Sequence, residues 1–223
     1  MRTTTTFNRV RNATLLGLAG VGAAGAIAFG PATAAHAAPA GPNLPADVAA
    51  PAAAAQSDLD VNGALQPNGY YCGPAATRVA LTGLGIAPSF DELAGKLGTT
   101  PNGTNSINDV TRVLNEYTGG GKYQSVEIPA GKASPEHTEK LRTDVVTAIN
   151  SGEPVVANIA GTVTDTAGES HSFKGGHYLT ITGYTEDGRL VSIADSWDKV
   201  GSNEYQVPVE KMANWIASRG YTA

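Results

Sequence analysis

The spacing of apolar residues changes character after Pro154. Before it, apolar residues recur at the three- and four-residue intervals of amphipathic helices, and after it they gather in short β-rich runs. We therefore predict helices over residues 74–84, 90–97, 107–118, 138–150 and 209–218. We predict strands over residues 155–159, 177–184, 189–194 and 204–207.

Residues at the ends of these segments support their boundaries. Ser89 and Glu92 have the spacing of a capping box, Ser106 can cap the third helix, and Gly119 can end it. Residues 183–188 read as the loop of a β-hairpin. Helices followed by antiparallel strands predict an α+β fold, with a helical N-terminal lobe and a β-sheet C-terminal lobe. Clefts form where two such lobes meet.

The N-terminus has the pattern of a secretory signal peptide. Arg2, Arg9 and Arg11 precede a 15-residue apolar stretch over residues 15–29, and the segment closes on the small-x-small pattern of residues 35–37. A membrane span needs about 20 apolar residues, so an uncleaved anchor is the weaker alternative. We expect residues 1–37 to be removed and the protein to be secreted, with no stable membrane association after cleavage.

The next segment, residues 38–58, is rich in Ala and Pro and reads as a flexible linker, with a site-blocking pro-segment as the alternative. Residues 59–223 are long enough for one domain with its own core. The predicted leader holds three of the 15 basic residues and none of the 20 acidic ones, so the remaining chain has a formal charge of −8. This balance argues against nucleic acid or an anionic membrane as a partner.

The chain contains one cysteine, Cys72. A secreted protein that uses cysteines for stability has an even number, so a single one needs another explanation. Gly73 allows close backbone approach and Pro74 suits a first helical turn, which puts the thiol at a helix N-terminus, where the thiolate is favoured. The alternative is a buried cysteine that packs as a small apolar residue.

A thiolate nucleophile needs a base, and we assign His177. It opens a predicted strand after Gly175 and Gly176, and alternation puts it on a core-facing row, so a purely structural core histidine is the alternative. His137 lies in a polar helix start and reads as solvent-exposed. His171 lies in a predicted loop that gives its ring no orientation.

Two further residues complete the candidate site. Asp195 follows the strand that neighbours His177 and can hold the imidazole tautomer, or it can simply begin a turn. Trp197 lies beside it and would shield the pair from water, or simply pack. Gln66 lies six residues before Cys72, and its amide can join the Cys72 backbone N–H in binding an oxyanion.

These segments together resemble a papain-like cysteine peptidase, and more narrowly the double-glycine leader peptidases, cysteine peptidase family 39. The resemblance is carried by the spacing from Gln66 to Cys72, by Cys72-Gly73-Pro74-Ala75, by Gly175-Gly176-His177-Tyr178 and by the later Asp195. It implies Cys72 as nucleophile, His177 as base, Asp195 as orienting residue and Gln66 as oxyanion-hole donor. It also implies a site between two lobes and no metal or other cofactor.

The expected function is hydrolysis of peptide bonds in a peptide or protein substrate. Two other classes remain open on the sequence. One is an amidase or acyl transferase that acts on cell-wall peptides or isopeptides, and the other is an inactive module that binds peptides. Neither the substrate nor the oligomeric state follows from the sequence.

Overall fold

A computed structural model of the chain describes residues 6–7, 54–129, 131–197 and 203–223. The predicted signal peptide and most of the predicted linker lie outside these residues. The largest unit is a seven-stranded sheet in the order β4-β9-β5-β6-β7-β8, and β2 also pairs with β6. Every pairing in this sheet is antiparallel.

The strands of this sheet are β2 (Ser57–Asp58), β4 (Ser125–Val126), β5 (Val155–Thr164), β6 (Ser170–Thr185), β7 (Leu190–Ala194), β8 (Glu204–Pro208) and β9 (Gly220–Thr222). Separately, β1 (Thr6–Phe7) pairs with β3 (Gly63–Ala64). The helices are α1 (Cys72–Gly83), α2 (Phe90–Leu97), α3 (Ile107–Thr118), α4 (Pro135–Asn150) and α5 (Val209–Ile216), and a short 3₁₀ turn, η1 (Glu186–Gly188), connects β6 to β7. Among the described residues, no helix is long and apolar enough to cross a membrane.

The helix ends follow the capping signals of the sequence. The Ser89 side chain accepts a hydrogen bond from the Glu92 N–H at the start of α2, and Ser106 accepts one from the Asn108 N–H at the start of α3. Gly119 ends α3 with a positive φ of 86°, which glycine adopts without a side-chain clash. These local hydrogen bonds confirm both predicted helices.

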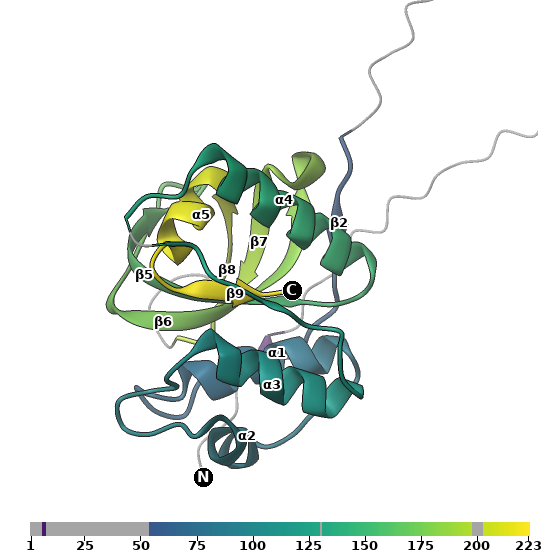
Figure 1. The fold of residues 1–223 in the computed structure, drawn as a ribbon, viewed down its shortest axis with the longest axis vertical. Helices are drawn as coiled ribbons and strands as arrows, with labels where there is room; N and C mark the ends of the chain where they lie inside the picture. Colours follow the sequence, from purple (N-terminus) through teal and green to yellow (C-terminus); the bar gives the residue numbers. More distant parts are fainter. Residues whose placement is uncertain (1–5, 8–53, 130, 198–202) are drawn as a thin grey trace, which may run out of the picture. The chain divides into compact units, whose positions relative to one another are not determined.

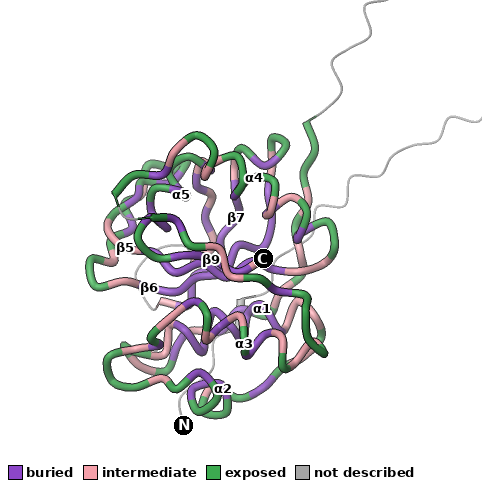
Figure 2. Tube along the Cα trace, in the orientation of Figure 1, coloured by how far each residue is buried: buried purple, intermediate pink, exposed green. Residues whose placement is uncertain are grey.

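Buried apolar side chains form two clusters on opposite faces of the sheet. One contains residues of α4 and α5 together with Ala157, Leu179 and Ile181, and the other contains residues of α1, α2 and α3 together with Val156 and Tyr178. Neighbouring positions in a strand point to opposite faces, which explains the division. Figure 1 shows α4 and α5 over one face and α1 to α3 over the other, and Figure 2 shows the buried stretches along β5, β6 and α1. The mixed helix and antiparallel sheet composition predicted from the sequence is confirmed.

Several element boundaries differ from the prediction. β4 and β9 were not predicted, because each has only two or three residues and is held by pairing with distant parts of the chain. β2 places Ser57 and Asp58 in the sheet, although the sequence put them at the end of the linker. α4 begins at Pro135 rather than 138, because Ser134 and His137 form a capping box there. His137 is half-buried by this role, and the prediction that it is solvent-exposed was wrong.

Candidate active site

Cys72 occupies the first turn of α1. The backbone N–H groups of a first helical turn have no partner within the helix and favour a negative charge nearby. Gly73 allows the close approach that the sequence indicated, since a Cβ added there would come 2.1 Å from Thr104 Oγ1. Thr104 is itself fixed by a 2.8 Å hydrogen bond with Thr99 Oγ1. The loop before α3 therefore packs directly against the backbone that carries the thiol.

His177 lies within β6, downstream of an irregularity in the strand. Ile159 pairs with His177 and Gly161 pairs with Phe173, so β6 has two more residues than β5 between these pairs. The extra length falls at the two glycines, and Gly176 has a φ of 99°. A bulge of this kind redirects the side chains beside it. The prediction that His177 opens a strand was wrong, because β6 already begins at Ser170.

The His177 ring is held by a buried carboxylate. Its Nε2 lies 2.7 Å from Asp195 Oδ1, and the two side chains are 3% and 1% exposed. Asp195 follows β7, which pairs with β6, so the neighbouring-strand geometry expected from the sequence is present. The same carboxylate accepts hydrogen bonds from the Trp197 N–H at 3.0 Å and from the Tyr205 hydroxyl at 2.9 Å. Three donors thus fix the orientation of the Asp195 side chain.

Aromatic rings enclose the imidazole. Phe173 stacks on His177 with ring centres 4.0 Å apart, and Trp197 meets it edge to face at 6.3 Å. The expected contact of Trp197 with the pair is therefore present. Burial among these rings strengthens the interaction between the imidazole and Asp195, since water does not screen it.

Cys72 and His177 form the electrostatic pair expected of a reactive thiol. Burial alone would raise the pKa of Cys72, but hydrogen bonds and charge from His177, with backbone hydrogen bonds from Tyr178 and Gly73, lower it overall. Burial would likewise lower the pKa of His177, but Asp195 and Cys72 raise it to about 9. Nε2 of His177 faces Asp195. The other ring nitrogen, Nδ1, is therefore the atom that interacts with Cys72. These opposite shifts favour a thiolate beside an imidazolium.

Gln66 is buried close to the residue that follows Asp195. Its backbone N–H donates to the Ser196 carbonyl at 2.9 Å, and its side-chain oxygen accepts from the Ser196 hydroxyl at 3.3 Å. Its Nε2 donates to the Asn68 carbonyl at 2.6 Å. Among the described residues, no second acceptor takes the other hydrogen of this amide. The structure thus places Gln66 beside the Asp195 segment, with one amide N–H uncommitted.

A cavity of about 200 Å³ opens beside the thiol. Its lining is mostly polar and comes from the α1 start, the loop before α3, β5, β6 and the turn before β9. The lining residues are Cys72, Asn102, Gly103, Thr104, Asn105, Asn158, Gly175, Gly176, His177, Tyr178 and Arg219. The bulge glycines form part of the wall, which gives a ligand room near the His177 ring.

A second buried histidine pair lies on the same strand. His171 Nε2 is 2.9 Å from Asp165 Oδ2, and His171 is fully buried rather than placed in a loop as predicted. Its ring stacks on Tyr205 with centres 3.7 Å apart. This pair was not predicted from the sequence, because the start of β6 was interpreted as a loop and the strand in fact begins at Ser170.

The His171 region also contains the one group of potential metal ligands found among the described residues. Ligand atoms of Asp165, Glu169 and His171 lie within 4.8 Å of one another. However, Asp165 Oδ1 already accepts from the Ala167 and Glu169 N–H groups at 2.9 and 2.8 Å, while Oδ2 faces His171. These hydrogen bonds use both oxygens of the Asp165 carboxylate to stabilise a turn and to hold His171. We therefore assign this group of residues a structural role.

A thiol at a helix start, beside a buried histidine–carboxylate pair and an open cavity, defines the class of thiol hydrolases. The chain belongs to the Peptidase_C39 like family, which it matches over residues 57–223, and it is therefore a cysteine peptidase. No curated protein matches the chain.

Several solved structures are similar to the chain. The chain is similar to a putative C39-like peptidase from Bacillus anthracis, with 16% identity, a TM-score of 0.52, and coverage of 75% of this chain and 96% of that one. A double-glycine motif protease from an AMS/PCAT transporter, in complex with the leader peptide, matches at 14% identity and a TM-score of 0.45, covering 74% and 91%. The peptidase domain of Streptococcus ComA, a bifunctional ABC transporter involved in quorum sensing, matches at 13% and 0.44, covering 75% and 96%.

Proposed function

We propose that this protein is a secreted cysteine peptidase that hydrolyses peptide bonds in the cavity beside Cys72. The observation that carries the proposal is the continuous arrangement of Cys72, His177 and Asp195, with a lowered thiol pKa and a raised imidazole pKa. In this proposal the two apolar clusters correspond to the two lobes of a papain-like domain. Membership of the Peptidase_C39 like family supports a peptide as the substrate class.

Acylation begins with the thiolate–imidazolium pair. The Cys72 sulfur attacks the carbonyl carbon of the scissile amide, so a C–S bond forms and the carbonyl oxygen becomes an oxyanion. The Cys72 backbone N–H and the uncommitted N–H of Gln66 stabilise this charge. When the C–N bond breaks, the imidazolium of His177 gives its proton to the leaving nitrogen, and an acyl-enzyme remains.

Deacylation uses the same groups in reverse. Neutral His177 takes a proton from water, the hydroxide attacks the acyl carbon, and the C–S bond breaks to release a carboxylate and the thiolate. Asp195 accepts a hydrogen bond from Nε2 throughout, which keeps Nδ1 directed at the sulfur and stabilises the imidazolium each time it forms.

Export is the second part of the proposal and rests on the sequence. The basic start, the apolar stretch of residues 15–29 and the small residues at 35–37 support cleavage after Ala37. Expression of residues 1–223 in a bacterial host, followed by N-terminal sequencing of the protein in the medium, tests this. A sequence that begins at Ala38 is expected, and an intact N-terminus in the cell fraction would contradict it.

The hydrolytic activity is tested with a peptide library and mass spectrometry. The purified protein is incubated with the library in ¹⁸O-labelled water, with and without an added amine, and the Cys72→Ala variant is the control. We expect cleavage products that depend on Cys72 and carry ¹⁸O in the new carboxylate. Products joined to an added amine instead of ¹⁸O would establish acyl transfer, and peptides that bind equally to both proteins without turnover would establish a binding module. Either result would overturn the proposed hydrolysis.

A further inference from the structure

The cavity beside Cys72 holds a positive charge that the proposed mechanism does not use. Arg219 lines this cavity together with backbone, amide and hydroxyl groups. Among the lining residues that the structure describes, it is the one whose charge is permanent, because an arginine side chain stays protonated at any pH at which the protein is folded. A fixed cation in a cavity with a reactive thiol bears on which substrates enter.

The backbone at Arg219 is held in a tight turn between α5 and β9. Ser218 has a φ of 74°, and its N–H donates to the Ile128 carbonyl at 3.0 Å. The Arg219 N–H donates to the Ile216 carbonyl at 2.9 Å. These bonds fix the position from which the long side chain extends.

The register of the sheet places Arg219 on the same cross-strand row as His177. Gly220 pairs with Asn158, so the same register continued by one residue sets Arg219 beside Ile159, which pairs with His177. Adjacent strands lie about 4.8 Å apart, so the backbones of Arg219 and His177 are separated by roughly 10 Å across two strand spacings. An arginine side chain spans most of such a distance.

The guanidinium lies against the bulge of β6. A Cβ added to Gly176 would come 3.1 Å from Arg219 Nη2, so the glycine provides the space that the guanidinium occupies. Arg219 is exposed, and it forms no hydrogen bond or ion pair through its side chain with the residues that the structure describes. Its donors are therefore available to a ligand.

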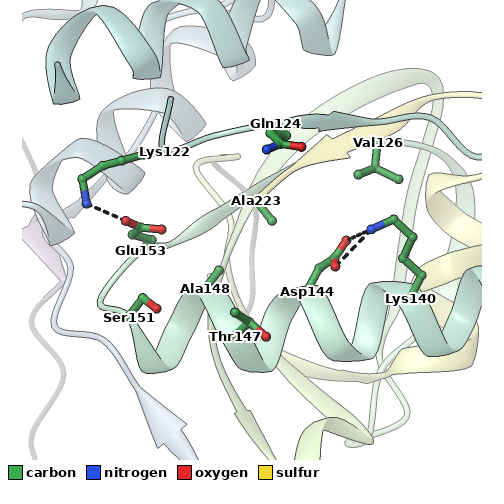
Figure 3. Close-up of a pocket in the computed structure, with 10 residues that line it drawn as sticks. All are labelled: Lys122, Gln124, Val126, Lys140, Asp144, Thr147, Ala148, Ser151, Glu153 and Ala223. Carbon is green, nitrogen blue, oxygen red and sulfur yellow. Dashed lines mark hydrogen bonds and ion pairs between the residues drawn. The ribbon is translucent and has the colours of Figure 1, made fainter. Parts of the chain in front are cut away.

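The cavity in Figure 3 shows the contrasting case. It also contains cations, but Lys122 lies 2.6 Å from Glu153 and Lys140 lies 2.8 Å from Asp144. Those charges are satisfied within the protein, and no cysteine is among the residues that line their cavity. Arg219 differs on both counts, because its guanidinium has no ion-pair partner in the described part of the chain and it shares its cavity with Cys72.

We propose that Arg219 forms a specificity subsite that recognises a carboxylate of the substrate close to the scissile bond. This inference rests on the proposed function and adds the substrate class, namely peptides with an acidic group beside the cleavage point. A guanidinium binds a carboxylate through two parallel N–H···O bonds, which also orients the ligand. Such a local attraction is needed in a chain whose part beyond the predicted leader has a formal charge of −8. The carboxylate can belong to an Asp or Glu side chain or to a free peptide C-terminus.

The first test compares two alkylating reagents at Cys72. Iodoacetate carries a carboxylate, whereas iodoacetamide has a neutral amide of the same shape. The ratio of their second-order rate constants is measured for the wild type, Arg219→Gln and Arg219→Lys. The matched control is Arg189→Gln, which removes another exposed arginine. Arg189 precedes β7, whereas Asp195 follows it, so the control lies at the other end of this strand from the site.

We expect the ratio of the iodoacetate rate constant to the iodoacetamide rate constant to fall roughly three- to tenfold in Arg219→Gln. This is the effect of removing one positive charge that attracts the carboxylate of iodoacetate over several ångströms in a partly screened site. It should stay near the wild-type value in Arg219→Lys and Arg189→Gln. An unchanged ratio in Arg219→Gln would overturn the inference. The ratio of rate constants can be measured even if Cys72 reacts slowly with both reagents. Slow reaction with both reagents would contradict the proposed function, whereas an unchanged ratio would contradict only the role of Arg219.

The second test separates the two sources of the carboxylate. Peptide libraries that contain Asp and Glu are compared with libraries in which these are Asn and Gln, each with a free or an amidated C-terminus. Loss of cleavage with Asn and Gln would identify an acidic side chain, and loss on amidation would identify a terminal carboxylate. Equal cleavage of all four libraries would overturn the inference.

Discussion

Strand β6 carries two buried histidine–carboxylate pairs that look alike and differ in what surrounds them. His171 and His177 lie six residues apart, and their Nε2 atoms are 2.9 and 2.7 Å from Asp165 and Asp195. Each carboxylate accepts two further hydrogen bonds. His177 faces a thiol and a cavity, whereas the His171 ring is covered by Tyr205. A buried His–Asp pair is therefore not a catalytic feature by itself. In the proposed mechanism, the nearby thiol and the open cavity distinguish the His177 pair from the His171 pair.

Substitutions in the His177 site should have the largest effect on turnover, which substitutions in the His171 pair should leave nearly unchanged. His177→Gln removes the proposed base and Cys72→Ala removes the proposed nucleophile, so kcat/KM should fall on the order of 10⁴-fold or more in each variant. The two changes act on one unit, so the double variant should lose little more than either single one. Kinetics on a peptide found by the library experiment measure this, and more than about a tenth of wild-type activity in either single variant would refute the assignment.

Replacing the carboxylate of the active pair should have a smaller effect. Asp195→Asn keeps a polar group of the same size but removes the charge that stabilises the imidazolium, so we expect a loss of about 10²-fold. In the wild type, hydrolysis should decline as the pH rises through about 9, because His177 then loses the proton that the leaving amine needs. In Asp195→Asn this decline should begin at a lower pH. A pH–rate profile with the same alkaline limb in both proteins would contradict the orienting role.

The matching change in the other pair should affect stability instead. His171→Gln leaves the buried Asp165 carboxylate without its imidazole partner, which should lower the free energy of unfolding by roughly 2–4 kcal/mol. We expect kcat/KM within about threefold of the wild type when measured well below the melting temperature, on the ground that His171 touches neither Cys72 nor the cavity. Thermal unfolding and peptide kinetics on the same sample separate the two outcomes. Wild-type stability combined with a large loss of turnover would reverse the roles of the two pairs.

Tyr205 connects the two regions and should give the smallest effect. Its ring stacks on His171 and its hydroxyl donates to Asp195, so Tyr205→Phe removes one donor and keeps the stacking. We expect a loss of about 1–2 kcal/mol in stability and less than about tenfold in kcat/KM. A double-mutant cycle with His171→Gln should show a coupling of at least roughly 0.5 kcal/mol. Strict additivity in the unfolding measurements would mean that the two pairs are independent.

The local parts of this architecture were predictable because they depend on neighbours in the sequence. Ser89 and Ser106 each cap the helix that follows, and the helix start at Cys72 follows from the Gly-Pro sequence after it. The closeness of His177 and Asp195 followed from reading two adjacent strands as a hairpin. The α+β composition followed from the change in apolar period.

The remaining parts depend on contacts between distant residues. β9 forms only because Gly220–Thr222 pair with β4 and β5. Gly175 and Gly176 were predicted to precede a strand, because the bulge at these glycines interrupts the alternation of apolar and polar residues along β6. His171 was read as a loop residue for the same reason. The position of Arg219 in the cavity that Cys72 also lines was not predicted, since it depends on the register of β9 against β5.

The most direct test of the account is the rate of Cys72 alkylation by iodoacetamide across a pH series, measured on the wild type, His177→Gln and His171→Gln. The account predicts fast labelling that persists well below pH 7 in the wild type and in His171→Gln, because the imidazolium of His177 lowers the pKa of the thiol. In His177→Gln, labelling should rise only near the free-thiol pKa of about 8.5. Wild-type labelling that also rises only near that pH would show an ordinary cysteine and contradict the account.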